Sequence, residues 1–198
     1  MGTRTRYKGA PFKERSGIMS PLASHLPIRS DSTMVRLFRE DDVAAFLAYR
    51  SDPELARYQG WSPMSGGEAR AFVARMARAT ELVAGDWIQL AIAHASTDVL
   101  LGDLGVFLAG DLARGEVGFT LSASGQGQGH ATRAVSAACE LLFAVNGSLE
   151  VYGVTDTRNT ASMGVLERAG FVHVATQRSV SRNEPCTEAV YRRRRGGA

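Results

Sequence analysis

The hydrophobic pattern of this chain changes its period several times, and each change predicts another element. Short apolar runs of strand length stand at residues 34–38, 87–93, 100–108 and 116–121. The last three are separated only by short loops, so we expect them to form an antiparallel meander. Further strands are expected over residues 149–155, 171–181 and 188–193.

Apolar residues at helical spacing predict the helices. Ser65 and Glu68 have the spacing of a capping box, and apolar residues then recur at helical intervals to about Ala84. Acidic residues at 40–42 favour a helix start that leads into residues 43–50. Two more helices are expected over about 129–145 and 160–169.

The order of these elements predicts an α+β fold. The strands at 116–121 and 149–155 flank a long helix, and such a crossover allows the two strands to lie parallel. Residues 1–32 contain scattered Gly, Pro, Ser and basic residues without a sustained period. We interpret them as a flexible N-terminal extension of a domain that spans residues 33–195.

Composition narrows the class of protein. The 198 residues, 44% of them hydrophobic and 22% charged, are ordinary for one globular domain with a sizeable core. No apolar run reaches the roughly 18 residues that a membrane span needs. Residues 1–20 also lack the apolar centre of a signal peptide, so we expect a cytoplasmic protein that does not enter a membrane.

The distribution of charge and of Cys and His residues argues against a nucleic-acid-binding protein and against a metalloprotein. Much of the basic excess stands near the chain ends, at residues 4–8 and 192–195, where charge runs are usually solvated tails. No basic patch is interleaved with aromatic residues, so we expect no direct nucleic acid binding. Cys139 and Cys186 lack the spacing of a disulfide or metal framework, and His94 and His173 lack partners at metal spacing, so no metal is expected.

The glycine-rich stretch Gln126-Gly-Gln-Gly-His-Ala131 lies between an expected strand and the long helix. Glycines at 125, 127 and 129 allow positive φ angles, and the first N–H groups of the helix converge without bulky side chains. This arrangement predicts an anion site. No Gly-Lys-Ser/Thr follows, which argues against a P-loop, and the glycine spacing does not match a dinucleotide-binding fold. A cofactor's pyrophosphate is the expected anion, although a purely structural turn stays an alternative.

Two motifs resemble one enzyme superfamily. The spacing Gln126-x-x-Gly129-x-Ala131 is similar to the acetyl-coenzyme A pyrophosphate loop of GNAT N-acetyltransferases, and residues 156–171 resemble their second signature. Residues 36–42 and 50–58 resemble the opening of the ribosomal-protein (alanine/serine) N-acetyltransferase branch. The resemblance implies a mixed, mostly antiparallel sheet with a splayed central pair of parallel strands, flanked by helices.

The resemblance also implies how acetyl-coenzyme A, the acyl donor, is held. Its pantetheine arm would pair with the backbone of Phe119, Thr120 and Leu121, and farther along with Asn159. Thr132 would add a hydroxyl contact. The pyrophosphate would lie on a loop in which His130 offers its backbone N–H while its ring faces solvent. The residues of that loop are Gln126, Gly127, Gln128, Gly129, His130 and Ala131.

The chemistry implied by the family is direct attack of a neutral amine on the acetyl thioester. Ser162 stands where some members of the branch place a serine beside the sulfur, so it is the candidate for protonating or stabilising the thiolate. A helix cap is its alternative role. Glu116 is the candidate base, with Asp156 or a water chain as alternatives. Glu116 could also be a surface glutamate without a catalytic role. The tyrosine that many relatives place a few residues later is replaced here by Val165-Leu-Glu167.

Three functional hypotheses remain at this point. The first is an acetyltransferase that acts on the N-terminal amine of a protein. The second keeps the chemistry but uses a small amine, such as an antibiotic or polyamine, or another acyl group. The third is a non-catalytic acyl-coenzyme A binding module. The sequence leaves the oligomeric state open, and a homodimer is one possibility. We expect the acceptor to be selected by the loops at residues 58–64 and 109–115.

Overall fold

The computed structural model describes residues 19–145, 150–181 and 184–196. The α-helices are α1 (Val43–Arg50), α2 (Pro53–Ala56), α3 (Gly66–Ala77), α4 (His130–Val145) and α5 (Thr160–Arg168), with 3₁₀ turns at Leu22–Ser24, Glu40–Asp42 and Ala123–Gly125. The strands are β1 (Met19–Pro21), β2 (Ile28–Ser30), β3 (Thr33–Arg36), β4 (Glu81–Val83), β5 (Trp87–His94), β6 (Leu100–Leu108), β7 (Arg114–Leu121), β8 (Glu150–Asp156), β9 (Val172–Ser181) and β10 (Glu184–Arg194).

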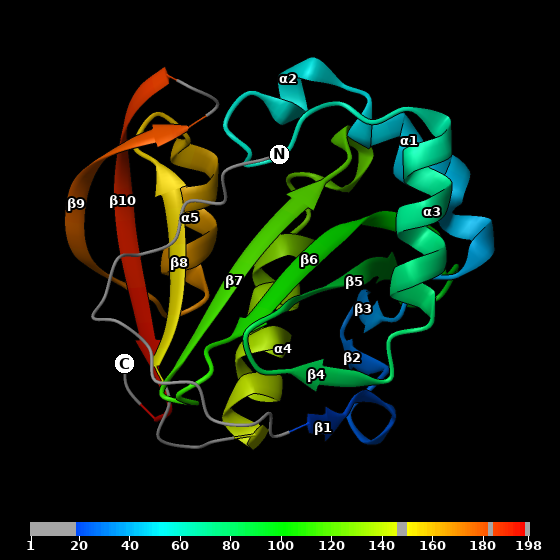
Figure 1. Ribbon diagram of the computed structural model, residues 1–198, viewed down its shortest axis with the longest axis horizontal. Helices are drawn as coiled ribbons and strands as arrows, with labels where there is room; N and C mark the ends of the chain where they lie inside the picture. Colours follow the sequence, from blue (N-terminus) through cyan, green and yellow to red (C-terminus); the bar gives the residue numbers. More distant parts are fainter. Residues whose placement is uncertain (1–18, 146–149, 182–183, 197–198) are drawn as a thin grey trace.

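One large sheet organises the molecule. Its strand order is β2-β3-β5-β6-β7-β8-β10-β9, and β1 pairs separately with β4 (Figure 1). The expected meander of β5, β6 and β7 is confirmed, because both of its pairings are antiparallel. The expected parallel pair is confirmed as well, since β7 and β8 run side by side in the same direction around α4. The α+β class therefore holds.

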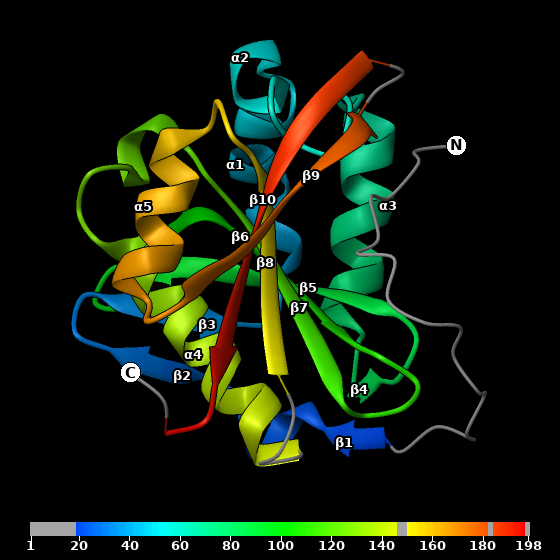
Figure 2. The ribbon, with the colours of Figure 1, turned by 90° about the vertical axis from the view of Figure 1, so that its left-hand side faces the viewer.

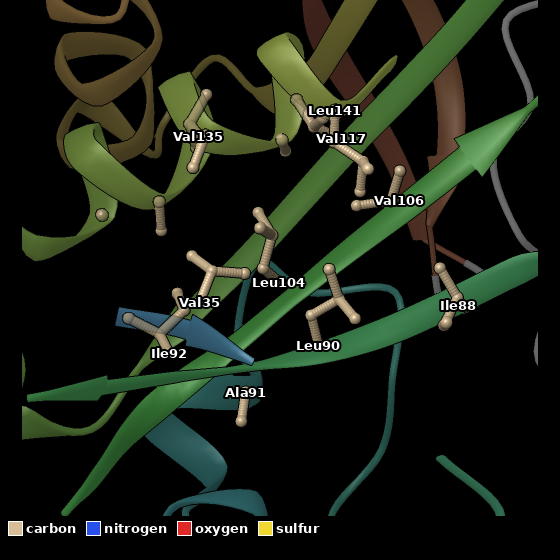
Figure 3. Close-up of a cluster of buried hydrophobic side chains, with 14 of the residues drawn as sticks. Val35, Ile88, Leu90, Ala91, Ile92, Leu104, Val106, Val117, Val135 and Leu141 are labelled. Atoms are coloured by element: carbon tan, nitrogen blue, oxygen red, sulfur yellow. The ribbon is translucent and has the colours of Figure 1, made fainter. Parts of the chain in front are cut away.

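Helices cover both faces of this sheet. Helices α4 and α5 lie on one side and α3 on the other, where α1 also packs (Figure 2). The core lies on both faces of the sheet, where strand residues pack against α4 on one side and against α1 and α3 on the other. Figure 3 shows Val135 and Leu141 of α4 facing side chains such as Val106 and Leu104 of the sheet.

The predicted helix starts are confirmed by their caps. Ser65 accepts a hydrogen bond from the Glu68 N–H while the Glu68 carboxylate accepts from the Ser65 N–H, which completes the predicted capping box of α3. The acidic turn at 40–42 precedes α1 as expected. The prediction that α3 continues to Ala84 was wrong. It ends at Ala77, because Leu82 is fully buried in β4, which pairs with β1.

The N-terminal expectation also needs a correction. Residues 19–32 contain β1 and β2, which pair with β4 and β3, so this part is not a flexible extension. Three-residue strands are too short to show a hydrophobic period, and only their partners in the sheet reveal them. Residues 1–18 lie outside the described residues, so the expected extension there stays a prediction. The basic residues of this stretch, at 4–8, are outside as well.

The basic C-terminal segment is not a solvated tail over its whole length, contrary to the prediction. Strand β10 runs to Arg194, and its last arginines pair with acids of neighbouring elements. Arg192 and Arg194 pair with Glu150 of β8, and Arg193 pairs with Glu140 of α4. These partly exposed ion pairs hold the end of β10 against β8 and α4, although each contributes little stability by itself.

Candidate active site

The parallel strands β7 and β8 part in the middle of the sheet. Their pairing begins at Arg114 and Glu150 and stops at Val117 and Gly153. Beyond that point β7 still pairs with β6 up to Leu121, and β8 still pairs with β10 up to Asp156. The ribbons diverge from there towards α2 (Figure 1). Residues 118–121 therefore have backbone groups on one edge that no described strand occupies, which is the geometry expected of the splayed pair.

Two cavities lie on either side of this opening. The first, which we call the α4-side cavity, has a volume of about 710 Å³. It is lined by the turn before α4 and by α5, with β7 and residues near α2 at its edge. The second, the β10-side cavity, has a volume of about 810 Å³ and is lined by β5 to β8, β10 and residues 50–64. Both cavities are lined by Tyr58, Phe119 and Thr120, so they meet at the opening.

Most of the predicted cofactor residues are gathered in the α4-side cavity. Gln128 and His130 do not line it. The predicted residues that do are Phe119, Thr120, Leu121, Gln126, Gly127, Gly129, Ala131, Thr132 and Asn159. The sequence did not suggest Arg168 of α5, an exposed cation at the rim of the same cavity that suits a phosphate group. An arginine on a polar helix face carries no local signal of such a role.

The glycine-rich turn has the backbone conformation of an anion site. Gly127 and Gly129 have φ angles of 74° and 80°, and a Cβ on Gly127 would point into open space. Gly125 was expected to share this role, but it does not adopt a positive φ. It is buried, and a Cβ there would lie 3.1 Å from Leu101. Close packing against Leu101 therefore requires a glycine at position 125.

Side chains hold the turn in place. Gln126 donates from Nε2 to the Leu121 carbonyl at 3.2 Å, and Gln128 donates to the Ser124 carbonyl at 2.8 Å. Arg133 of α4 donates to the Gln128 carbonyl at 2.9 Å. The exposed turn and the first N–H groups of a 16-residue helix form the kind of site that suits an anion.

His130 differs from the expectation. Its ring does not face solvent, because only 2% of the residue is exposed and Nδ1 lies 2.8 Å from the Thr33 hydroxyl. The ring also meets His94 edge to face, with centroids 5.9 Å apart. Burial, with Arg133 and His94 nearby, lowers the pKa of His130. The ring is buried because the first turn of α4 packs on β3, a contact that the local sequence does not reveal.

Asn159 and Ser162 stand at the start of α5. Asn159 is the N-cap, and its Oδ1 accepts a hydrogen bond from the Ser162 N–H at 3.1 Å. Because Asn159 supplies the cap, the alternative role of Ser162 as a helix cap does not apply. Both residues line the α4-side cavity. The amide group of Asn159 keeps its own N–H donors for another partner.

The two carboxylates considered as bases lie in different settings. Glu116 is partly buried on β7, one residue before the strands part, and lines the β10-side cavity. Asp156 accepts hydrogen bonds from Arg158 on both oxygens, with Nε and Nη2 at 2.9 and 2.6 Å. Hydrogen bonding to Arg158 lowers the pKa of Asp156. A tightly paired carboxylate is a poor proton acceptor, which argues against Asp156 as the base.

A buried polar network forms part of the β10-side cavity and was not predicted. Asp103 of β6 pairs with Arg50 of α1 and accepts a hydrogen bond from the Tyr49 hydroxyl at 2.8 Å. The Arg50 guanidinium lies over the Trp61 ring, 4.4 Å from its centroid. The Trp61 indole donates to the Thr120 hydroxyl at 3.4 Å. The one sequence signal was a lone aspartate in an otherwise apolar strand.

The two loops expected to select the acceptor have different positions. Within residues 58–64, Tyr58, Trp61 and Met64 line the β10-side cavity. Neither cavity is lined by residues 109–115, so that part of the expectation was wrong. The turn between β6 and β7 lies at the closed end of the β7–β8 pair, where Arg114 meets Glu150.

Two observations concern metals and membranes. Among the described residues, no group of three or more His, Cys, Asp or Glu side chains is placed to hold a metal ion. The described part of the chain also contains no helix that is both long and apolar enough to cross a membrane.

Cys139 is buried within α4, as expected for a small core residue, and burial raises the pKa of its thiol to about 12.

Comparison with known proteins identifies the family of this chain. Residues 33–172 match the family model of the acetyltransferase (GNAT) domain, and the chain therefore belongs to this family. It is an acetyl-coenzyme A-dependent N-acyltransferase. The third hypothesis, a non-catalytic acyl-coenzyme A binding module, is therefore not supported. None of the curated proteins matches the sequence.

Solved structures share the fold at low sequence identity. A GNAT-family acetyltransferase from Bacillus anthracis has a TM-score of 0.75 at 19% identity, covering 85% of this chain and 98% of that one. A ribosomal-protein alpha-N-acetyltransferase in complex with coenzyme A has a TM-score of 0.67 at 18% identity, covering 85% and 97%. A spermidine N-acetyltransferase from Vibrio cholerae, in complex with coenzyme A and spermine, has a TM-score of 0.65 at 15% identity, covering 81% and 93%.

Proposed function

We propose that this enzyme transfers the acetyl group of acetyl-coenzyme A to the N-terminal amine of a protein, as members of the ribosomal-protein branch do. The observation that carries the proposal is the opening between β7 and β8 beyond Val117 and Gly153. A cavity with the glycine-rich turn lies on one side of it, and a cavity lined by carboxylates and aromatic rings lies on the other. A thioester that reaches the opening would meet an amine arriving from the opposite side.

The chain's own residues divide the donor's binding among them. The backbone of Phe119, Thr120 and Leu121 pairs with the pantetheine amides at the unoccupied edge of β7, and Asn159 donates its amide N–H farther along. Thr132 adds a hydroxyl, and the turn binds the pyrophosphate through backbone N–H groups. The turn consists of Gln126, Gly127, Gln128, Gly129, His130 and Ala131. Support comes from the placement of most of these residues around one cavity.

One side chain accepts the proton of the amine, and another stabilises the departing thiolate. Glu116 removes a proton from the attacking amine, directly or through water, because its carboxylate lies beside the opening in the β10-side cavity. Ser162 donates a hydrogen bond to the departing thiolate, because it lines the α4-side cavity and does not cap α5. The cytoplasmic location and a homodimer stay predictions.

A small amine is the second candidate acceptor. The spermidine N-acetyltransferase with a similar fold supports it, and the carboxylates of the β10-side cavity suit any ammonium group. The decisive experiment measures thiol release from acetyl-coenzyme A with a panel of N-terminal peptides and small amines. Turnover with peptides that exceeds turnover with small amines, and that rises with pH as the acceptor loses its proton, supports the proposal. Turnover with small amines alone would contradict it.

A further inference from the structure

Three carboxylates are almost fully buried in the wall of the β10-side cavity. They are Asp103, Asp156 and Glu188, with exposed fractions of 2%, 8% and 6%. Asp103 is paired with Arg50 at 2.6 Å, and Asp156 with Arg158 at 2.6 Å. Two of these three negative charges are thus matched by guanidinium groups of the protein.

Glu188 has a different partner. Its Oε2 accepts a hydrogen bond from the Gln177 Nε2 at 3.2 Å, and an amide brings no positive charge. Among the described residues, no arginine, lysine or histidine forms an ion pair with Glu188. A buried carboxylate without a cation is unfavourable unless a positive charge reaches it. Because Glu188 lines the cavity, a bound molecule can supply that charge.

We propose that Glu188 is a specificity-determining residue that binds a second positive charge on the acceptor, in addition to the amine that is acetylated. This inference rests on the proposed function, since it names the chemistry of the acceptor at the same site. The acceptor class is a dicationic amine. Either a peptide with a basic side chain close to its N-terminus or a polyamine offers that chemistry.

The sheet sets the spacing between the two charges. Glu188 of β10 pairs with Asp156 of β8, and Asp156 lies three residues beyond Gly153, where β7 and β8 part. At the usual rise of a strand this is a distance of about 10 Å. Because reaction takes place at the opening, the second charge of the acceptor should lie about 10 Å from the reacting nitrogen.

Cys186 lies on the same face of β10, two residues before Glu188, and lines the same cavity. Burial, together with the charges of Glu188 and Asp156, raises the pKa of its thiol. A lysine at this position would place an ammonium group within reach of the Glu188 carboxylate. The Cys186→Lys variant therefore supplies a positive charge for the Glu188 carboxylate without changing Glu188 itself.

The test compares matched acceptors that differ by one charge. Two peptides, with arginine or glutamine at the second and third positions, form one arm, and spermidine against a monoamine of similar length forms the other. The wild type should show a kcat/KM on the order of 10 to 100 times higher for the charged member of at least one arm. The arm in which this occurs identifies the source of the second charge.

The variants then assign the preference to Glu188. Glu188→Gln and Cys186→Lys should both abolish it through a higher KM for the charged acceptor, with kcat and acetyl-coenzyme A affinity unchanged. Glu140→Gln removes one negative charge from α4, outside both cavities, and should keep the preference. Thermal unfolding of each variant checks that it is folded. If Glu188→Gln does not fold, the Cys186→Lys variant tests the inference in its place.

Other outcomes overturn the inference. A wild type that acetylates amines without regard to a second charge contradicts it while leaving the proposed function intact. Equal losses of kcat for charged and uncharged acceptors in Glu188→Gln, with a shifted pH profile, would make Glu188 a proton acceptor instead. A wild type that acetylates no amine at all would remove the proposed function, and a normal thermal shift with acetyl-coenzyme A would show that the protein itself was intact.

Discussion

Arg50 and Asp103 form a buried ion pair between α1 and β6. The Arg50 Nη2 lies 2.6 Å from the Asp103 Oδ1, and the two side chains are 4% and 3% exposed. The same guanidinium packs on the ring of Trp61, which in turn donates to Thr120 on the open part of β7. The pair therefore links the helix layer to the residues that form the mouth of the site.

Removing one partner of this pair should destabilise the protein strongly. Asp103→Ala leaves the Arg50 guanidinium buried without a counter-charge, so the free energy of unfolding should fall by about 3–5 kcal/mol. Denaturant unfolding measures this change. Glu140→Ala breaks the ion pair with Arg193 at a position where the Glu140 side chain is 63% exposed, and should cost less than about 1 kcal/mol. A similar small loss for Asp103→Ala would show that Arg50 reaches water or another partner.

Binding of acetyl-coenzyme A should depend on the turn before α4. The wild type should gain about 2.7 kcal/mol at a free concentration of 100 times Kd, which a thermal shift detects. Gly129→Glu should abolish that shift, because its Cβ would lie 2.9 Å from the Arg133 Nη1 that holds the turn, and its carboxylate would repel the pyrophosphate. Gly85→Glu is the matched control, since Gly85 also has a positive φ but lies outside both cavities. A normal shift for Gly129→Glu would assign the turn to structure alone.

Ser162→Ala should lower kcat by on the order of 10²-fold while the affinity for acetyl-coenzyme A stays nearly the same. The hydrogen bond to the thiolate matures only as the thiolate departs, so its loss affects the transition state rather than binding. Steady-state kinetics and a binding titration separate the two quantities. Thr160→Ala, at an exposed position on the first turn of the same helix, should behave like the wild type. Normal turnover of Ser162→Ala would exclude the proposed role.

Glu116→Gln should lower the rate most near neutral pH. If the carboxylate accepts the proton of the amine, the loss should shrink as rising pH deprotonates the acceptor without help. The pH profile of kcat/KM for wild type and variant measures this. A loss of the same size at every pH would mean that Glu116 positions the acceptor or supports the fold instead of acting as a base.

His130 should make stability depend on pH. Its pKa is lowered in the folded state by burial, Arg133 and His94, with Asp31 opposing them. The unfolded chain therefore takes up a proton first as pH falls below about 6.5, and the folded state loses stability on acidification. His130→Gln should flatten the fall of the thermal midpoint between pH 7 and pH 5. An unchanged slope in this variant would assign the pH dependence to other groups.

Local patterns in the sequence determined most of the elements. The bounds of β6 match the prediction, and α4 and α5 differ from it by a residue at one end, because hydrophobic period and capping are properties of neighbouring residues. The backbone conformation of the glycine-rich turn was predictable for the same reason, since Gly127 and Gly129 need no distant partner to adopt their φ angles.

Tertiary structure alone decided which side chains are buried and paired. Asp103 meets Arg50 across 53 positions of the chain. The ring of His130 is enclosed by Thr33, 97 positions away. Strands β1 and β4 form only because each satisfies the backbone groups of the other. The environment of a charge is set by what folds around it, so the unmatched carboxylate of Glu188 becomes visible only when β8, β9 and β10 lie side by side.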